Sequence, residues 1–245
     1  AFDSCVNLSV VVLNDGIKNI GIDAFKDCEN LKKINLPDGL LTIGDAAFAR
    51  CESLSPSMII PDTVTSIGKC AFGECRGLIS VKLPAGLSVI KKGLFNGCEC
   101  LSSITIPDSV TAIEDEAFRY CHELSSVVVP IGVESIGDNA FYNCSHLIRV
   151  EIKNPDCVIF DSETTFTRTT TLCGLRNSTA EKYARKYERK YEDTTPPEIV
   201  ESGNCGIDFK NLKWTLDAEG VLTISGEGAM RKWHDYESPW QDRDD

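Results

Sequence analysis

Cysteine is the residue type in this chain with the most evident capacity for chemistry. The sequence contains twelve cysteines, and thiols can form disulfides, hold metals or act as nucleophiles. Seven of them recur at intervals of 23 residues, with one step of 24: Cys5, Cys28, Cys51, Cys75, Cys98, Cys121 and Cys144. A fixed interval predicts that each of these cysteines belongs to one unit of an internal repeat.

Two interpretations of this cysteine column stay open. Stacked neighbours would be close enough for an occasional disulfide, but seven members cannot all pair. Free cysteine is among the most buried residue types, so we expect the column to consist mainly of core thiols. The better candidates for a disulfide lie off the column: Cys70, Cys100, Cys157, Cys173 and Cys205.

The sequence predicts no metal site, no cofactor and no catalytic centre. It has no C-x-x-C pair, and His122, His146 and His234 are scattered without ligand spacing. It also has no phosphate-binding glycine loop, no H-E-x-x-H and no nucleophile elbow. Adjacent carboxylates such as Asp115 and Glu116 are expected to be solvated side chains beside a turn.

The element that must position the thiols is a unit of 23 residues, A-F-x-x-C-x-x-L-x-x-I-x-L-P-x-x-L-x-x-I-G, as at 24–44. Alanine, phenylalanine, cysteine and leucine form an apolar stripe that predicts a short helical turn. Ile34 and Leu36 then alternate with polar residues, which predicts a strand with one buried face, ended by Pro37. We expect the glycines that close several units to adopt backbone angles that a Cβ would forbid, at Gly21, Gly44, Gly68 and Gly137.

No single unit can bury its own apolar face, whereas stacked units form one continuous core. We therefore predict a repeat solenoid of leucine-rich-repeat type, with short parallel strands and a short helical turn in each coil. The extra residue between Leu54 and Pro61 predicts a bulge or a local kink. The expected core residues are Phe25, Cys28, Leu31, Phe48, Cys51, Phe72, Cys75, Phe95, Cys98, Phe118, Cys121, Phe141 and Cys144.

The repeat resembles the BspA-type leucine-rich-repeat proteins of bacterial surfaces, and in particular those of Gram-positive gut anaerobes. The resemblance rests on seven in-register copies of A-F-x-x-C-x-x-L from residue 1 to about residue 152. It extends to 171–191, which looks like the family's terminal cap, a last strand followed by a closing helix. Ser178 and Glu181 have the spacing of a capping box. An apolar stripe at helical spacing comprises Ala180, Tyr183, Ala184, Tyr187 and Tyr191.

Composition divides the chain into three parts. We expect a solenoid over 1–193, with its cap at about 156–193, then a linker over 194–202 and a small β-hairpin module over 203–245. The alternating run KWTLDAEGVLTIS at 213–225 predicts the hairpin. Its buried face should hold Trp214, Leu216, Leu222 and Ile224, covered by Trp233, Tyr236 and Trp240. Because the chain starts inside a repeat, we expect it to be a piece of a longer protein, so the missing signal peptide says nothing about export.

Charge and hydropathy disfavour two classes of partner. The formal net charge is −12, so a nucleic acid would be repelled. The longest apolar runs are far shorter than the roughly 18 residues that a membrane-spanning helix needs. We expect neither nucleic-acid binding nor membrane insertion of this segment.

The strand positions that should face outward vary between units, while the buried columns hardly vary. Extended solenoid sheets offer rigid binding faces without a large ordering cost. The alternative is that these positions vary because nothing selects them. The candidate ligand-binding residues are Lys33, Asn35, Ser80, Lys82, Ser103, Thr105, Arg149 and Glu151.

The resemblance implies adhesion. It suggests a non-catalytic module, extracellular or associated with the cell wall, that binds host or bacterial surface proteins or glycans. The alternative is a structural spacer or targeting appendage of a larger surface enzyme.

Overall fold

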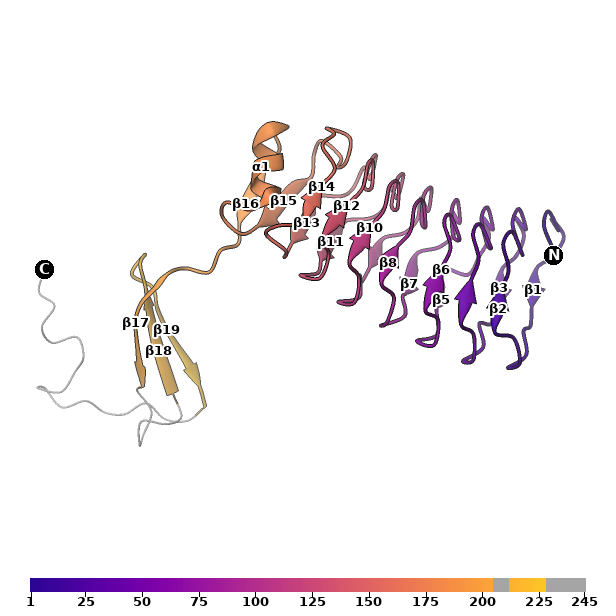
Figure 1. Ribbon diagram of the computed structural model, residues 1–245, viewed down its shortest axis with the longest axis horizontal. Coiled ribbons are helices and arrows are strands. Elements are labelled where there is room, and N and C mark those ends of the chain that lie inside the picture. Colours follow the sequence, from indigo (N-terminus) through magenta and orange to yellow (C-terminus); the bar gives the residue numbers. More distant parts are fainter. Residues whose placement is uncertain (205–211, 228–245) are drawn as a thin grey trace, which may run out of the picture. The chain divides into compact units, whose positions relative to one another are not determined.

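The computed structural model describes residues 1–204 and 212–227. The chain forms two compact units, Ala1–Thr194 and Thr195–Asp245. The first unit is a solenoid whose coils lie side by side, each contributing two short strands and a turn segment (Figure 1). We refer to the three sides of the stack as the first face, the second face and the turn edge.

The first face is formed by the strand that follows each turn segment. Its ladders are parallel and fall into three sheets, β1-β3, β5-β7-β9 and β11-β13-β15-β16. The strands are β1 (Val10–Val11), β3 (Lys33–Ile34), β5 (Ser57–Ile59), β7 (Ser80–Lys82), β9 (Ser103–Ile104), β11 (Ser126–Val129), β13 (Arg149–Ile152), β15 (Thr171–Gly174) and β16 (Tyr191–Asp193).

The second face is formed by the later strand of each coil, in the two parallel sheets β2-β4-β6 and β8-β10-β12-β14. Its strands are β2 (Asn19–Ile20), β4 (Thr42–Ile43), β6 (Ser66–Ile67), β8 (Val89–Ile90), β10 (Ala112–Ile113), β12 (Ser135–Ile136) and β14 (Val158–Ile159). Its second position is an isoleucine in every strand, and this side chain packs in or against the core. The parallel strands predicted from the period-2 pattern are confirmed.

The 24-residue step interrupts the first face. Strand β5 pairs with β7 at an offset of 23 residues, Ser57 opposite Ser80, but β3 and β5 belong to separate sheets. The second face absorbs the extra residue as a longer offset between β4 and β6, where Thr42 lies opposite Ser66. The expected irregularity is therefore a break in one ladder.

The turn edge differs from the short helical turn expected from the spacing. Around Phe25, Asp23 and Asp27 have φ values of 51° and 55°, and a residue in this left-handed region cannot continue a right-handed helix. The amide of Phe25 donates to Ala47 of the next coil at 2.8 Å, and that of Asp27 donates to Ala49 at 2.8 Å. Hydrogen bonds between coils therefore replace those within a helix.

Phenylalanine rings form a column through the core. Successive rings from Phe2 to Phe141 lie 5.2–5.8 Å apart with interplanar angles of 7–16°. Phe166 extends the column, 5.4 Å from Phe141, although the 25-residue step hid it in the sequence. All the predicted core residues are buried.

The column cysteines are core thiols with a defined hydrogen bond. In each of six coils the thiol donates to the carbonyl oxygen of a phenylalanine one coil back, as Cys98 Sγ does to Phe72 at 3.0 Å. In the last coil Thr167 Oγ1 takes this role toward Phe141, at 3.1 Å. All eleven cysteines within the described residues are free thiols. Cys205 lies outside that part of the chain.

The repeat glycines serve close packing and not unusual backbone angles. A Cβ on Gly68 would lie 2.3 Å from the backbone nitrogen of Asp45, and one on Gly44 would lie 2.6 Å from Gly21. The positive φ expected at these positions is therefore wrong, because the constraint is the approach of neighbouring coils.

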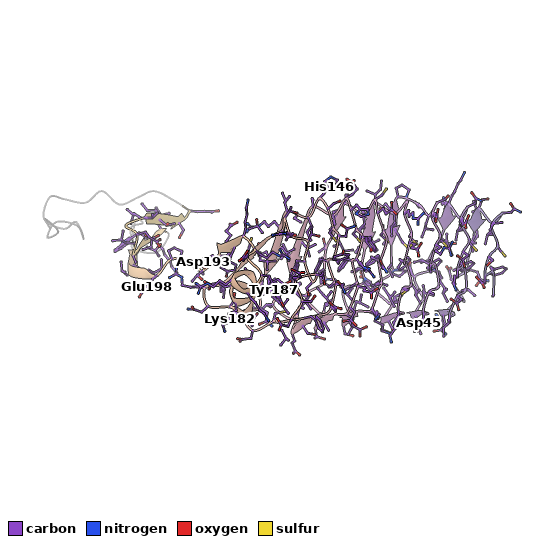
Figure 2. The ribbon with its side chains drawn as sticks, turned by 90° about the horizontal axis from the view of Figure 1, so that it is seen from above. Asp45, His146, Lys182, Tyr187, Asp193 and Glu198 are labelled. Carbon is purple, nitrogen blue, oxygen red and sulfur yellow. The ribbon has the colours of Figure 1, made fainter. Side chains whose placement is uncertain are left out.

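The cap closes the end of the stack next to β15. Helix α1 (Thr179–Lys186) begins after Ser178, whose hydroxyl accepts a hydrogen bond from the amide of Glu181. The ring of Tyr183 meets Phe166 edge-on, with centroids 5.5 Å apart. Figure 2 shows Lys182 and Tyr187 on this helix. The expected helical stripe ends sooner than predicted, because Tyr191 starts strand β16.

The second unit holds an antiparallel sheet of β17 (Ile199–Asn204), β18 (Leu212–Asp217) and β19 (Leu222–Gly226). The predicted hairpin is β18 and β19. Strand β17 is an addition that lies partly within the expected linker. Trp214 is buried, but Leu222 and Ile224 are exposed, so the expected shared buried face is incomplete. Its expected cover of Trp233, Tyr236 and Trp240 lies outside the described residues.

Candidate functional site

A hollow of about 510 Å³ lies on the first face over β5, β7 and β9. Parallel pairing in register sets Ser57, Ser80 and Ser103 side by side across these strands. Ile59 and Lys82 form the neighbouring outward pair. The alternation of the strands, which buries Met58 and Val81, therefore points a row of hydroxyls and a mixed apolar and cationic row into the hollow.

Hydrogen bonds organise the polar groups of this hollow. Ser80 Oγ donates to Ser57 Oγ at 3.2 Å. Lys82 Nζ lies 3.4 Å from a carboxylate oxygen of Asp62. The amide of Ala85 donates to the other oxygen of that carboxylate, and this bond, with the nearby Lys82 charge, lowers the pKa of Asp62. Asp62 therefore stays ionised and orients the ammonium group.

A second hollow, of about 340 Å³, continues along the same face toward β11. The two hollows share Ser103 and Thr105, and the second one reaches Val128 and Lys153. The first face therefore presents a shallow surface that continues across four coils.

Four of the eight predicted ligand-binding residues line the first hollow: Ser80, Lys82, Ser103 and Thr105. Lys33 and Asn35 lie beyond the break between β3 and β5. The Asn35 amide accepts from the Leu13 amide at 2.8 Å and donates to the Leu13 carbonyl at 2.7 Å. Its side chain thus joins two coils and is already engaged.

Arg149 and Glu151 lie on β13, away from the hollow. The Arg149 guanidinium pairs with Glu192 of the cap strand β16 and lies 3.9 Å from Glu151. Cys173 Sγ lies 3.7 Å from the same Glu192 carboxylate. This cluster ties the last coils to the cap, a role that strand alternation alone does not indicate.

The sequence analysis missed two residues of the hollow, Ser57 and Ile59. Ile59 is 67% exposed, which makes it a large apolar side chain open to a partner. The extra residue in LSPSMIIP obscured which positions of this coil face outward. Aligning Pro61 with Pro84 would have given the observed register.

Other chemistry has little support in the described part of the chain. It contains no group of three or more histidine, cysteine or acidic side chains placed to hold a metal. Burial raises the pKa of the Cys51 and Cys144 thiols to about 12, so these thiols stay protonated. No helix in the described ranges is both long and apolar enough to cross a membrane.

Comparison with solved structures supports the architecture. A leucine-rich repeat protein from Bacteroides ovatus is 28% identical over 71% of this chain, with a TM-score of 0.60. A leucine-rich repeat protein from Eubacterium ventriosum is 28% identical over 57% of this chain and 37% of its own, with a TM-score of 0.50. This chain spans about half of the Bacteroides ovatus protein, 51%. Among curated proteins there is no match.

The family follows from the repeat itself. Residues 1–57 and 53–173 match the family described as BspA type leucine rich repeat region (6 copies). The matched residues make up most of the chain and contain the phenylalanine column, the cysteine column and both strand faces up to β15. The chain therefore belongs to the BspA-type leucine-rich-repeat family.

Proposed function

We propose that this protein is a non-catalytic binding module that holds its partner on the first face, over β5, β7 and β9. The observation that carries the proposal is the hollow of about 510 Å³ with exposed Ile59 and Lys82 at adjacent positions. A location outside the cell or on the cell wall is inferred from the resemblance to bacterial surface proteins of this repeat type.

The lining of the hollow favours binding over catalysis. Within the described residues, Lys82 is the one charged side chain that lines it, and it is already paired with Asp62. A lone, paired ammonium offers neither a general acid and base pair nor an activated nucleophile. Because the hollow is formed by hydrogen-bonded strands, a partner would order few side chains on binding.

A protein partner fits the hollow better than a glycan does. Its lining combines aliphatic side chains and serine hydroxyls, and no aromatic ring lines it within the described residues. Sugars commonly stack on aromatic rings, whereas an apolar side chain can cover Ile59 and a carboxylate can reach Lys82. Host or bacterial surface proteins are therefore the first class of partner to test, and glycans the second.

The test is a binding screen against matrix proteins, bacterial surface proteins and glycan arrays, followed by charge reversal. Lys82→Glu should weaken binding of a hit about tenfold or more. Lys33→Glu is the matched control, because Lys33 is exposed on the first face but lies outside the hollow. Loss of binding in Lys33→Glu with full binding in Lys82→Glu would place the partner elsewhere and refute the proposal.

A structural spacer or targeting appendage of a larger surface enzyme is a second candidate function. The unbroken phenylalanine column favours it, because a stiff stack would hold neighbouring domains apart. The full-length reading frame separates the two: an adjoining catalytic domain, together with an isolated module that binds nothing in the screen, would support the spacer.

A further inference from the structure

A hollow of about 320 Å³ lies beside the turn edge near the cap. Tyr142 contributes to it from the last regular coil, Thr164, Thr167 and Arg168 from the segment that follows, and Arg189 from the chain after α1. Most of these residues lie where the 23-residue repeat has ended. The proposed partner site on the first face does not use them.

Arg189 is held in place but only partly satisfied. Its backbone amide donates to Ala184 at 2.8 Å, and its Nη2 donates to the carbonyl oxygen of Glu163 at 2.6 Å. Its Nε is buried and has no hydrogen-bond partner. A buried donor without a partner is uncommon and calls for an explanation such as an absent ligand. The guanidinium is thus pre-oriented with one donor to spare.

The distribution of arginine partners singles out this hollow. Six arginines in the described residues pair with a carboxylate: Arg50, Arg76, Arg119, Arg149, Arg176 and Arg185. Arg168 and Arg189 form no such pair within the described ranges, and both line the hollow. In a chain with a net charge of −12, two arginines without a carboxylate partner in one place are unexpected.

The remaining lining defines the kind of anion. Glu163 also lines the hollow, so its formal charge is +1, which suits a monoanion. Thr167 Oγ1 donates to Phe141 and retains lone pairs for a ligand hydroxyl. The tyrosine of the lining adds a ring on which a sugar can stack. The volume is near the lower end for small-molecule sites, about 300 to 1,000 Å³, so one sugar unit would occupy it.

We propose that this hollow binds a carboxylated sugar unit, with Arg168 and Arg189 holding the carboxylate and Tyr142 and Thr167 contacting the ring and its hydroxyls. An acidic peptide is less suited, because extended peptides dock along sheet edges or long grooves and this hollow is compact. Planar guanidinium groups match the geometry of a carboxylate, and arginine remains charged at all relevant pH values.

The experiment titrates the full chain with glucuronic acid and N-acetylneuraminic acid, with glucose as the neutral comparison and a glutamate-containing peptide as the alternative anion. We expect both acids to bind and glucose not to bind. Arg168→Ala should weaken binding of the acids about tenfold or more, since hydrogen bonds to charged groups are strong. Arg168 forms no contact that the fold requires in the described structure, so this variant should fold.

Arg185→Ala is the matched control. It removes the same charge from an exposed arginine of α1 that pairs with Glu181 and does not line the hollow. We expect it to bind the acids as the unaltered chain does. Equal binding of glucose, equal losses in Arg168→Ala and Arg185→Ala, tighter binding of the peptide than of either sugar acid, or no binding of either acid would each overturn the proposal.

Discussion

At the scale of single residues, the phenylalanine column unites burial and stacking. Phe95 is fully buried and lies 5.8 Å from Phe72 and 5.7 Å from Phe118, in near-parallel planes. Offset stacking adds to the free energy gained from burying each ring. Each ring contacts a ring on both sides, so losing one leaves a cavity shared by three coils.

Phe95→Ala should lower the free energy of unfolding by about 3 to 5 kcal/mol, from lost burial and the residual cavity. Urea denaturation followed by circular dichroism measures the change. Phe2→Ala is the control, because Phe2 is 52% exposed and has one ring neighbour, and its loss should be much smaller. An effect of Phe95→Ala below about 1 kcal/mol would count against a packed column.

Thiol reactivity tests the second column. Cys5 and Cys100 are exposed, whereas Cys28, Cys75 and Cys121 are buried. Reaction requires access and the thiolate form, and burial raises the pKa of all three buried thiols. A bulky maleimide should therefore label Cys5 and Cys100 within minutes and the buried three only after denaturation, as read by peptide mass spectrometry. Rapid labelling of the buried three in the folded protein would contradict this packing.

Residue-level patterns predicted the columns but not their ends. The fixed spacing identified Phe25 through Phe141, yet Phe166 follows after 25 residues and was missed. Thr167 replaces the cysteine thiol with a hydroxyl that makes the same kind of bond. Sequence spacing reveals only identical units, whereas a stacked core requires the same contact and accepts a different residue or spacing that provides it.

At the scale of elements, the distance between coils constrains the glycines. The backbone of Gly68 lies against that of Asp45 so closely that any Cβ would overlap the Asp45 nitrogen. Gly21 holds the equivalent position one coil from the open end, and a Cβ there would meet nothing within 4 Å. The two glycines thus have the same place in the repeat but different neighbours.

Gly68→Ala should lower the free energy of unfolding by about 1 to 3 kcal/mol, because overpacking forces the two coils apart. Gly21→Ala, the control, should be neutral or slightly stabilising, since it reduces the entropy of the unfolded chain. Thermal unfolding of both variants under the same conditions measures the difference. Equal destabilisation by both would indicate a backbone-angle requirement and not close packing.

Elements differ in how far the sequence determines them. The outward positions Ser80, Lys82, Ser103 and Thr105 followed from strand alternation, because that period is local. The engagement of Asn35 with Leu13, and of Arg149 with Glu192, depends on neighbouring coils or the cap and left no local pattern. Strands of two or three residues also form only within the stack, which is why β16 was not predicted.

At the scale of the whole molecule, we propose that the two units fold independently, as a solenoid up to Thr194 and a small sheet after it. Thr194 closes the first unit, since its amide donates to Gly174 at 2.8 Å. A chain ending at Thr194 should unfold within about 2 °C of the solenoid transition of the full chain, because repeat stability depends on neighbouring coils. A lower transition temperature, measured by calorimetry, would show that the solenoid needs the second unit.

The thiol column also makes the solenoid sensitive to alkali. Burial raises the pKa of Cys144 from 9.0 to about 12, so the folded state keeps its proton where the unfolded chain loses it. The stabilising effect is complete below pH 9 and is lost as the pH rises toward 12. Between pH 8 and pH 10, each such thiol should reduce the free energy of unfolding by about 1.4 kcal/mol. Urea denaturation at both pH values with reductant present measures the total.

Comparing single variants isolates one thiol from the other groups that titrate in this range. Cys144→Ala should show a loss between pH 8 and pH 10 that is smaller than that of the unaltered chain by about 1.4 kcal/mol, whatever its stability at pH 8. Cys100→Ala removes an exposed thiol and should leave the loss unchanged. An identical pH dependence in the unaltered chain and in Cys144→Ala would mean that the column thiols are not shielded from water when the solenoid is folded.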